Sequence, residues 1–256
     1  MVLQAQEGRL TTSAVRILVA TAVPAERDAV AGAFTDGTAE VRLPGSALLH
    51  RTRAGRAEYD LLAAGVGPAL AAAGTATALT AAALDGRPYA LVVCAGIAGG
   101  FRPAAPVGSL VVADEIIAAD LGAETADGFV PVTELGFGTV SHRPPDPLVR
   151  VTAKATGARP GAVLTVSTVT GSAARAAELR ARHPHALAEA MEGSGVAEAA
   201  AAHGVPVLEI RAVSNPVGPR DRAAWRIADA LAALTEAFGK LAPALESWNP
   251  HDPHDQ

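Results

Sequence analysis

The sequence contains one cysteine and no concentration of positive charge. Because Cys94 is alone, a disulfide bond within the chain is excluded and a reducing compartment is favoured. It lies in the apolar run YALVVCAG, so we interpret it as a buried packing thiol rather than a nucleophile. The formal net charge of −5 gives no electrostatic basis for binding nucleic acid, and no basic stripe interleaved with aromatic residues is present. We therefore expect no nucleic-acid partner.

Long apolar runs are also lacking. Each run is broken by Gly, Pro or a charged residue before it reaches the roughly 20 residues that a membrane helix needs. The first residues, MVLQAQEGRLTTSA, lack the basic start and continuous apolar core of a signal peptide. We expect a cytoplasmic protein with no membrane partner.

What the sequence does contain is a regular alternation of two patterns. Half of its 256 residues are hydrophobic, and short runs rich in Val, Ile and Leu alternate with Ala-rich stretches. The continuous runs predict strands covered on both faces, as in a mainly parallel sheet, at residues 15–21, 59–65, 89–96, 109–118, 162–168 and 205–214. Helices are predicted at residues 24–34, 68–84, 172–182, 193–203 and 220–240, the last with Trp225 on its apolar face.

This order of strands and helices predicts a single α/β domain over residues 15–243. The stretch SHRPPDPL, residues 141–148, is predicted to be an irregular loop. Residues 1–14 and 244–256 are predicted to be flexible ends.

Ligands of open α/β sheets bind beyond the carboxyl ends of the strands, so polar residues and glycines near these ends are the candidates. The candidates near the predicted strand ends are Glu26, the glycine turns 65–67 and 95–100, the segment 167–171, Met191-Glu192 and Ser214-Asn215-Pro216. Each also has an ordinary structural interpretation, as an acid in the first turn of a helix, a tight turn, a helix cap or an Asx-type turn. Together, two carboxylates, one amide and several glycine turns favour a pocket for a neutral polar ligand.

Motifs of other ligand classes are absent from the sequence. It has no Gly-x-x-x-x-Gly-Lys loop, no Gly-x-Gly-x-x-Gly turn, no serine nucleophile elbow and no His or Cys cluster at metal spacing. His251 and His254 alternate with aspartates near the carboxyl end, where an unstructured tail is favoured over a metal site. We expect neither a metal nor a cofactor.

Six segments, in order along nearly the whole chain, resemble the nucleosidase branch of the purine-nucleoside phosphorylase-like superfamily. They are ILVATAVPAERDAV, LLAAGVGPALAAAGTATAL, VVCAGIAGGF, GSLVVADEIIAADLGAE, LTVSTVTGS and AMEGSGVAEAAAAHGVPVLEIRAVSN. The resemblance implies a three-layer α/β/α fold with a mainly parallel, twisted, mixed central sheet, and a homo-oligomer of two or more copies. Within the branch, VSTVTG and RAVSNPVGPRDRAAWRI are more similar to the futalosine hydrolase family than to the methylthioadenosine/S-adenosylhomocysteine nucleosidases.

The resemblance also implies a role for each candidate residue. Glu26 matches the carboxylate that orients and deprotonates the attacking water. Met191 and Glu192 match the pair that packs under the ribose and accepts hydrogen bonds from its hydroxyl groups. The two glycine turns supply further expected substrate-binding residues, Val66, Gly67, Ile97, Ala98 and Gly99.

The residues implied to hold the base decide which purine is expected. Thr168 and Val169 match the segment that holds the purine, and Asn215, with Ser214 behind it, matches the position facing N7 and the 6-substituent. The adenine nucleosidases have an aspartate at the position of Asn215. An asparagine amide has no proton to give to N7 of adenine as an acid. Its N–H can still stabilise the negative charge that collects on O6 of a departing 6-oxopurine, so we expect hypoxanthine as the leaving group.

The expected activity is hydrolysis of the N-glycosidic bond of futalosine, which releases hypoxanthine during menaquinone biosynthesis, with a purine nucleoside as the small-molecule partner. An adenine nucleosidase, a nucleoside phosphorylase and a nucleoside-binding protein without turnover remain as alternatives. Phosphorolysis is disfavoured because Glu26 would repel phosphate and the turn around Ile97, where many relatives have a small hydroxyl residue, carries no arginine. Arg102 and Arg143 are candidates for binding the carboxylated side arm of futalosine.

Overall fold

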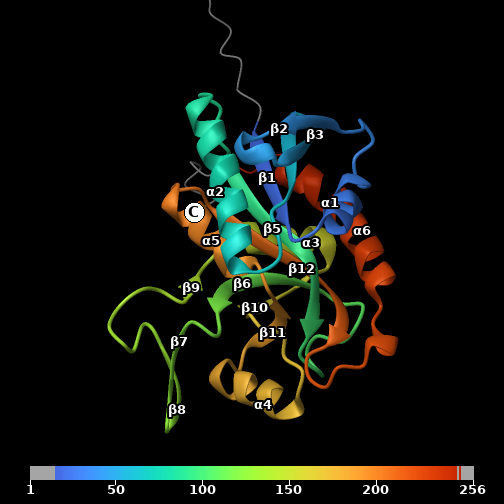
Figure 1. Cartoon of the computed structure of the whole chain (residues 1–256). Helices are drawn as coiled ribbons and strands as arrows, with labels where there is room; N and C mark the ends of the chain where they lie inside the picture. The colour runs from blue at the N-terminus through green and yellow to red at the C-terminus, as the bar shows by residue number, and fades with distance from the viewer. Residues whose placement is uncertain (1–14, 247, 249–256) are drawn as a thin grey trace, which may run out of the picture.

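The computed structural model of the chain describes residues 15–246 and Trp248. The predicted flexible residues 1–14 and 249–256, with His251 and His254, lie outside the described residues. A long sheet runs through the molecule and helices lie on both sides of it (Figure 1). The strands are β1 (Arg16–Thr21), β2 (Ala39–Arg42), β3 (Leu48–Ala54), β4 (Ala57–Ala63), β5 (Leu91–Gly100), β6 (Leu110–Ala118), β7 (Gly122–Thr125), β8 (Gly128–Pro131), β9 (Ser141–His142), β10 (Arg159–Thr165), β11 (Ala186–Ala190) and β12 (Val207–Pro216).

The helices are α1 (Pro24–Ala31), α2 (Pro68–Leu84), α3 (Asp146–Thr156), α4 (Ala173–Arg182), α5 (Gly193–Ala202) and α6 (Ile227–Leu245), with short 3₁₀ turns η1 (Pro44–Ser46) and η2 (Arg222–Ala224). The sheet has the strand order β11-β10-β6-β12-β5-β1-β4-β3-β2, with β9 paired to β6. Its centre, β12-β5-β1-β4, is parallel, whereas β6 pairs antiparallel with β12, and β3 with β4. This mixed, mainly parallel sheet confirms the expected fold class.

The two faces of β1 show why its sequence is continuously apolar. Ile17 and Val19 belong to a core cluster that contains buried residues of α1, α3 and α6. Leu18 and Ala20 belong to a second cluster with residues of α2 and α5. Because successive side chains of a strand point to opposite faces, a strand between two helical layers needs apolar residues at every position. The three layers follow from this pattern.

Some predicted boundaries are wrong. β10 ends at Thr165 because its partner β6 ends opposite it at Ala118, so residues 166–168 form a loop. Residues 141–148 are not wholly irregular, since β9 pairs with β6 and α3 begins at Asp146. At the other end of the chain, α6 continues to Leu245, past the predicted domain end at residue 243, and Trp248 is buried beside it.

The start of α6 was also predicted wrongly. The helix begins at Ile227 rather than at residue 220. The main-chain N–H of Arg226 donates to the carbonyl oxygen of Ser214 at the end of β12, which fixes the chain just before the helix. Trp225 therefore lies in the connection between η2 and α6 and not on a helix face.

Strand β11 was not predicted because its sequence, ALAEA, favours helix by composition. It is a strand because β10 pairs with it along its length and the last residues of β5 pair with its end. Tertiary pairing outweighs local propensity here.

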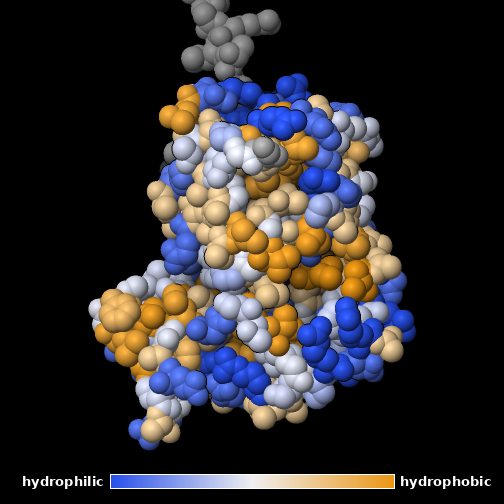
Figure 2. Space-filling view, viewed as in Figure 1, coloured by the Kyte–Doolittle hydropathy of each residue, from blue (hydrophilic) through white to orange (hydrophobic). Residues whose placement is uncertain are grey.

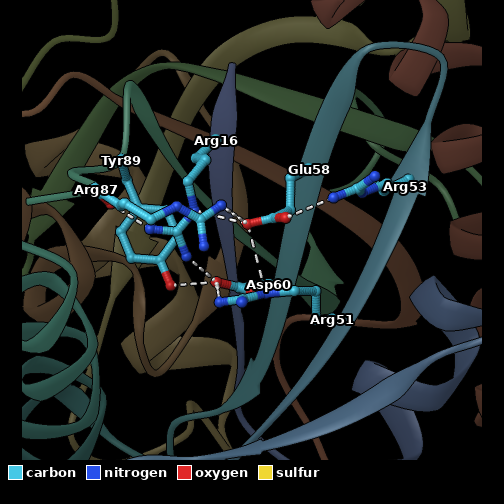
Figure 3. Close-up of polar contacts among 7 residues, drawn as sticks. All are labelled: Arg16, Arg51, Arg53, Glu58, Asp60, Arg87 and Tyr89. Carbon is cyan, nitrogen blue, oxygen red and sulfur yellow. Dashed lines mark hydrogen bonds and ion pairs between the residues drawn. The ribbon is translucent and has the colours of Figure 1, made fainter. Parts of the chain in front are cut away.

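Buried charges pair with one another at the amino ends of β1 and β4 (Figure 3). Arg16 donates to Glu58 (2.8 Å) and Asp60 (2.5 Å), and Arg51 on β3 donates twice to Asp60 (2.7 and 2.9 Å). The hydroxyl of Tyr89 donates to Asp60 as well. Burial alone would raise the pKa of Asp60, but these donors outweigh it and hold the pKa below its ordinary value. The cluster links β1, β3 and β4 at the amino ends of β1 and β4, whereas the candidate residues lie near the carboxyl ends of the strands.

Candidate active site

A cavity of about 260 Å³ lies at the carboxyl ends of β1, β5, β11 and β12. Gly67 and Thr168, predicted to bind substrate, are not among its lining residues: Gly67 donates its N–H to Glu192 (3.3 Å), and Thr168 is exposed in the loop after β10. The other predicted site residues all line the cavity: Glu26, Val66, Ile97, Ala98, Gly99, Val169, Met191, Glu192, Ser214 and Asn215. The structure therefore brings these ten predicted residues together around one cavity.

The carboxylate of Glu26 is held by two main-chain N–H groups, one from the connection after β1 and one from β5. It lies in the first turn of α1, is 4% exposed, and accepts hydrogen bonds from the N–H groups of Ala22 (3.0 Å) and Ile97 (2.8 Å). Burial raises the pKa of this carboxyl group, although the charge of Arg211 and the two N–H groups act in the opposite direction. A carboxylate with a raised pKa and remaining lone pairs beside a cavity has the properties of a general base.

Gly96 lets this carboxylate approach β5. A Cβ atom at residue 96 would lie 2.6 Å from Oε1 of Glu26 and 2.7 Å from Nη1 of Arg211. Both distances are shorter than real Cβ contacts, so a side chain at residue 96 would displace the carboxylate and the guanidinium from these positions. Residues 95–100, predicted as a glycine turn, belong to strand β5, and Gly96 within this strand makes room for side chains of the site.

Glu192, which directly precedes α5, is paired with a buried arginine. Its Oε2 accepts from Nη1 of Arg211 (3.3 Å) and from the N–H of Met191 (3.3 Å), while its Oε1 accepts from Gly67. Arg211, on β12, is 1% exposed and also donates from Nε to Glu209 (2.8 Å). The arginine therefore positions Glu192 from behind the cavity.

The guanidinium of Arg211 contacts two buried carboxylates, Glu192 and Glu209, and lies near enough to Glu26 to feel its charge. Burial alone would lower the pKa of Arg211, but the negative groups around it, including Glu209, Glu192 and Glu26, raise it well above its ordinary value. Burial raises the pKa of Glu209 against the effect of the same arginine. Arg211 is thus a permanent positive charge behind the two carboxylates that line the cavity.

A β-bulge at the end of β12 aims Asn215 into the cavity. In the pairing of β12 with β5, Val213 lies opposite Ala98 and Asn215 lies opposite Gly99. Ser214 is therefore an extra residue in its strand, and such an insertion re-aims the side chain that follows. This bulge explains why an apolar strand ends in a polar pair.

Two neighbours fix which end of the Asn215 amide faces the cavity. Nδ2 donates to the carbonyl oxygen of Pro216 (3.0 Å), which can only accept, so the NH₂ group must occupy this position. Oδ1 accepts from the hydroxyl of Ser214 (2.9 Å). A Cβ atom at Gly99 would lie 3.4 Å from Nδ2 and 3.0 Å from Cγ2 of Val217, so the NH₂ group lies beside Gly99, which lines the cavity. The amide presents a donor to a ligand there.

Sequence reasoning did not assign a site role to Arg211, Glu189 or Trp225, although Glu189 and Trp225 line the cavity and Arg211 supports it. A signal for Arg211 was present, because Glu209 and Arg211 alternate within an otherwise apolar run and residues two apart on a strand face the same side. Glu189 had no such signal, since its segment was not recognised as a strand.

The arginines predicted to meet a side arm do not line the cavity. Arg143 is exposed and pairs with Glu115 (3.2 Å), and Arg102 does not contribute to the lining. Arg220 and Arg222 lie beside Trp225, which lines the cavity. Their guanidinium carbons are 5.5 Å and 5.8 Å from the centre of its ring.

A second cavity, about 360 Å³, lies at the opposite edge of the sheet beside the cluster of Figure 3. None of the predicted site residues lines it. Arg16, Arg51 and Arg87, which do, are paired with the buried Glu58 and Asp60. Because these charges neutralise one another, the smaller cavity is the better candidate for chemistry.

Other reactive groups are not assembled in the described part of the chain. Cys94 is fully buried, and burial raises the pKa of its thiol well above the ordinary value, as expected for a packing residue. Among residues 15–246 and Trp248, no group of three or more His, Cys, Asp or Glu side chains could hold a metal ion. Over the same residues no helix combines the length and hydrophobicity needed to cross a membrane.

The sequence of the chain matches a known superfamily of enzymes. The family model described as the phosphorylase superfamily matches residues 16–246. The chain therefore belongs to the phosphorylase superfamily.

Two relatives assign the chain to a narrower family within this superfamily. The futalosine hydrolase of Streptomyces coelicolor is 76% identical over 236 residues, which cover 92% of this chain and 99% of that protein. The futalosine hydrolase of Acidothermus cellulolyticus is 48% identical over 235 residues, 90% of this chain and 91% of that protein. The chain belongs to the futalosine hydrolase family. The native structure of futalosine hydrolase from Helicobacter pylori shares the fold, with a TM-score of 0.78 at 17% identity over 90% of this chain and 98% of that one.

Proposed function

We propose that this chain hydrolyses the N-glycosidic bond of futalosine in the cytoplasm, forming hypoxanthine and dehypoxanthine futalosine as a step of menaquinone biosynthesis. The observation that carries the substrate assignment is the 76% identity to the Streptomyces coelicolor futalosine hydrolase over 99% of that protein. The geometry supports cleavage of a purine nucleoside, because Glu26, Glu192 and Asn215 meet around one cavity.

In the proposed mechanism the glycosidic bond breaks before water attacks. The positive charge that develops on the ribose ring is stabilised by the two buried carboxylates, Glu26 and Glu192, and Glu192 accepts hydrogen bonds from the ribose hydroxyl groups. Glu26 then takes a proton from the attacking water. Arg211 keeps Glu192 in position from behind.

The leaving base is stabilised by the amide of Asn215. As the bond breaks, negative charge spreads over N7 and O6 of a 6-oxopurine. The NH₂ group, held in orientation by Pro216 and Ser214, points a donor at this charge without needing a proton to transfer. Adenine lacks O6 and gains more from protonation at N7, which an amide cannot supply.

Phosphate is a poor nucleophile for this cavity. Its two charges would face the carboxylates of Glu26 and Glu192. Arg211, the cation behind the cavity, is 1% exposed and already bound to Glu192 and Glu209. Water is neutral and meets no such repulsion, so hydrolysis is favoured over phosphorolysis.

The test is purine release, measured by liquid chromatography, from futalosine, inosine and methylthioadenosine, each with and without phosphate. We expect hypoxanthine from futalosine at a rate that phosphate does not change. Release of adenine from methylthioadenosine would favour the adenine nucleosidase, and dependence on phosphate would favour the phosphorylase. Binding of futalosine without any release of base would identify a nucleoside-binding protein.

The carboxylated arm of futalosine gives a prediction for Arg220 and Arg222, which lie near Trp225 at the cavity. The variant Arg220→Met/Arg222→Met should raise KM for futalosine about tenfold, the size of one lost hydrogen bond to a charged group. The KM for inosine, which has no such arm, should stay the same. Arg143→Met is the control because this arginine is exposed outside the cavity. An equal change in both KM values would contradict the assignment.

We also propose that the chain forms a homo-oligomer. Figure 2 shows apolar side chains over the N-terminal end of α2 and along the segment between β8 and β9. Leu70 is 60% exposed and Phe137 is 64% exposed in these regions, and such patches mark interaction surfaces. Sedimentation velocity at micromolar concentration should give at least a dimer, and Leu70→Glu or Phe137→Glu should shift it toward monomer. A wild-type monomer would rule the proposal out.

A further inference from the structure

Glu209 is a buried carboxylate to which the proposed mechanism gives no role. It lies on β12, is 0% exposed, and is not among the residues that line the cavity. Its Oε1 accepts a hydrogen bond from Nε of Arg211 (2.8 Å). Residues two apart on a strand face the same side, so both side chains lie on the face of β12 that also carries Val207 and Val213. These valines pack in the cluster that contains residues of α5, so the ion pair lies on the side of the sheet that α5 covers.

The carboxylate of Glu209 lies against the start of α5. A Cβ atom at Gly193, the first residue of this helix, would be 2.3 Å from Oε2 of Glu209, so the glycine leaves the room that this oxygen occupies. Within the described part of the chain Oε2 has no hydrogen-bond partner, so a proton on it would find no acceptor. Burial raises the pKa of Glu209, but Arg211 and the positive end of the α5 dipole act in the opposite direction. The geometry therefore favours the ionised form.

This carboxylate decides how the charge of Arg211 is balanced. The guanidinium also contacts Glu192 (3.3 Å), and it lies near Glu26, since a Cβ atom at Gly96 would meet both groups. Without Glu209, the positive charge of the arginine would cancel one of the two carboxylates of the cavity. With Glu209, the arginine is neutralised by a group outside the cavity, so Glu26 and Glu192 keep both of their negative charges.

We propose that Glu209 neutralises Arg211 and thereby keeps the cavity negative enough to stabilise a ribosyl cation. The assignment rests on the proposed function, in which positive charge develops on the ribose ring as the glycosidic bond breaks. The arginine is needed because it holds Glu192 in place, yet its own charge opposes the charge on the ribose. Inside a protein this effect extends over several ångströms, because the effective dielectric constant is far below that of water. Glu209 is thus a positioning residue that acts through Arg211.

The experiment is calorimetric titration with two C-nucleosides, which contain no cleavable glycosidic bond. One is 9-deazainosine, and the other is its analogue in which a protonated NH₂⁺ group replaces the ring oxygen of the ribose. They differ by one positive charge where the cation forms, so the ratio of their dissociation constants measures the charge preference of the cavity. We expect the wild-type protein to bind the cationic compound more tightly, and Glu209→Gln to lower this charge preference about 10–100-fold, the effect of one interior charge. Equal binding by the wild-type protein, or an unchanged preference in the variant, would overturn the proposal.

Two further variants separate the charge of Glu209 from its contact. Glu209→Gln keeps an oxygen for Nε of Arg211, whereas Glu209→Val keeps no polar group. Both lose the same charge, so both should lower the charge preference alike, and Glu209→Val gives the comparison even if Glu209→Gln does not fold. Glu209→Asp keeps the charge and should retain most of the preference. If Glu209→Asp lost as much preference as Glu209→Gln, shape and not charge would be responsible, and the proposal would be wrong.

Glu58→Gln is the matched control. Glu58 is also buried and paired with an arginine, Arg16 (2.8 Å), but it lies in the cluster at the amino ends of β1 and β4. The substitution removes a buried carboxylate outside the cavity and should leave the charge preference unchanged, whatever it does to Tm. A loss equal to that of Glu209→Gln would show that the preference follows stability, which would contradict the proposal.

Failure of this proposal and failure of the proposed function are distinguishable. A charge preference that depends on Glu209, without cleavage of futalosine, would leave the role of Glu209 intact and refute the hydrolase. Cleavage of futalosine with a preference that does not depend on Glu209 would do the reverse. If both hold, kcat for futalosine should fall with the preference across the variants, while KM changes little because the ribose of futalosine is uncharged.

Discussion

Replacing Glu26 by Gln is expected to lower kcat for base release from futalosine between about 10²-fold and 10⁴-fold, with little change in KM. The amide keeps the shape of the side chain but cannot take a proton from water. It should still fit between the N–H groups of Ala22 and Ile97, with one of its two contacts weakened. Steady-state kinetics by chromatographic assay measures both constants. A variant with wild-type kcat would show that the base has been assigned wrongly.

The same residue sets an expected pH dependence. Glu26 acts only when ionised, and burial raises its pKa above the ordinary value of 4.5, with Arg211 opposing and Glu192 reinforcing the shift. Activity should therefore fall as the pH drops through this raised pKa, so the acidic limb of kcat/KM should lie above pH 4.5. This limb should disappear in Glu26→Gln.

Asp28→Asn is the matched control for Glu26→Gln. Asp28 lies on the same helix, α1, and its side chain is 58% exposed at the surface, where it pairs with Arg27. The substitution makes the same change of carboxylate to amide outside the cavity. It should leave kcat, KM and the pH profile unchanged, so any shared effect would point to the helix and not to the catalytic carboxylate.

Arg211→Met is expected to have the largest effect on stability. Removing one partner of a buried ion pair costs about 3–5 kcal/mol, because the other partner stays buried without compensation. Here Glu192 and Glu209 both lose their hydrogen-bonded cation. For a chain of this size each kcal/mol corresponds to about 2–4 °C in Tm, so a decrease of roughly 10 °C is expected in a thermal melt at pH 7.5. A change within 2 °C would contradict the assigned role.

The double variant Arg211→Met/Glu209→Gln tests the cause. If uncompensated charge is the reason, removing one of the carboxylates should restore part of the lost Tm, and the two effects should not add. The loss should also shrink at acidic pH. Burial already raises the pKa of Glu209 against the effect of Arg211, so loss of the arginine should raise that pKa further; stability is then retained at low pH and lost as the pH rises through it. Arg53→Met, an exposed ion-pair partner of Glu58, should change Tm little.

The elements that the sequence predicted well are those whose pattern is local. The helix α2 has the predicted bounds, Pro68–Leu84, because Pro68 sets its first turn and the alanine-rich run has no competing preference. β1 was recognised because a strand covered on both faces is apolar at every position. β11 was missed because its five residues are stabilised by two neighbouring strands and not by their own propensity.

The features of the candidate site also divide into those that a local pattern predicted and those that depend on tertiary contacts. Polar residues and glycines at predicted strand ends, together with the family resemblance, named most of the lining residues. The pairing of Arg211 with Glu192 and Glu209 was not predicted, and neither was the bulge at Ser214 that aims Asn215. These features depend on register and on contacts between distant segments, which no local pattern contains.

The sequence by itself determined the alternation of strands and helices, the covering of the strands on both faces, and the set of polar groups that the strand ends could offer. These follow from hydrophobic period and turn residues, which act over a few neighbours. Only the tertiary structure decided that Glu26 and Arg211 both approach Gly96, and that Glu189 and Asn215 both lie opposite Gly99. The physical reason is that strand order and register are set by the packing of the whole sheet, and register alone decides which side chains share a face.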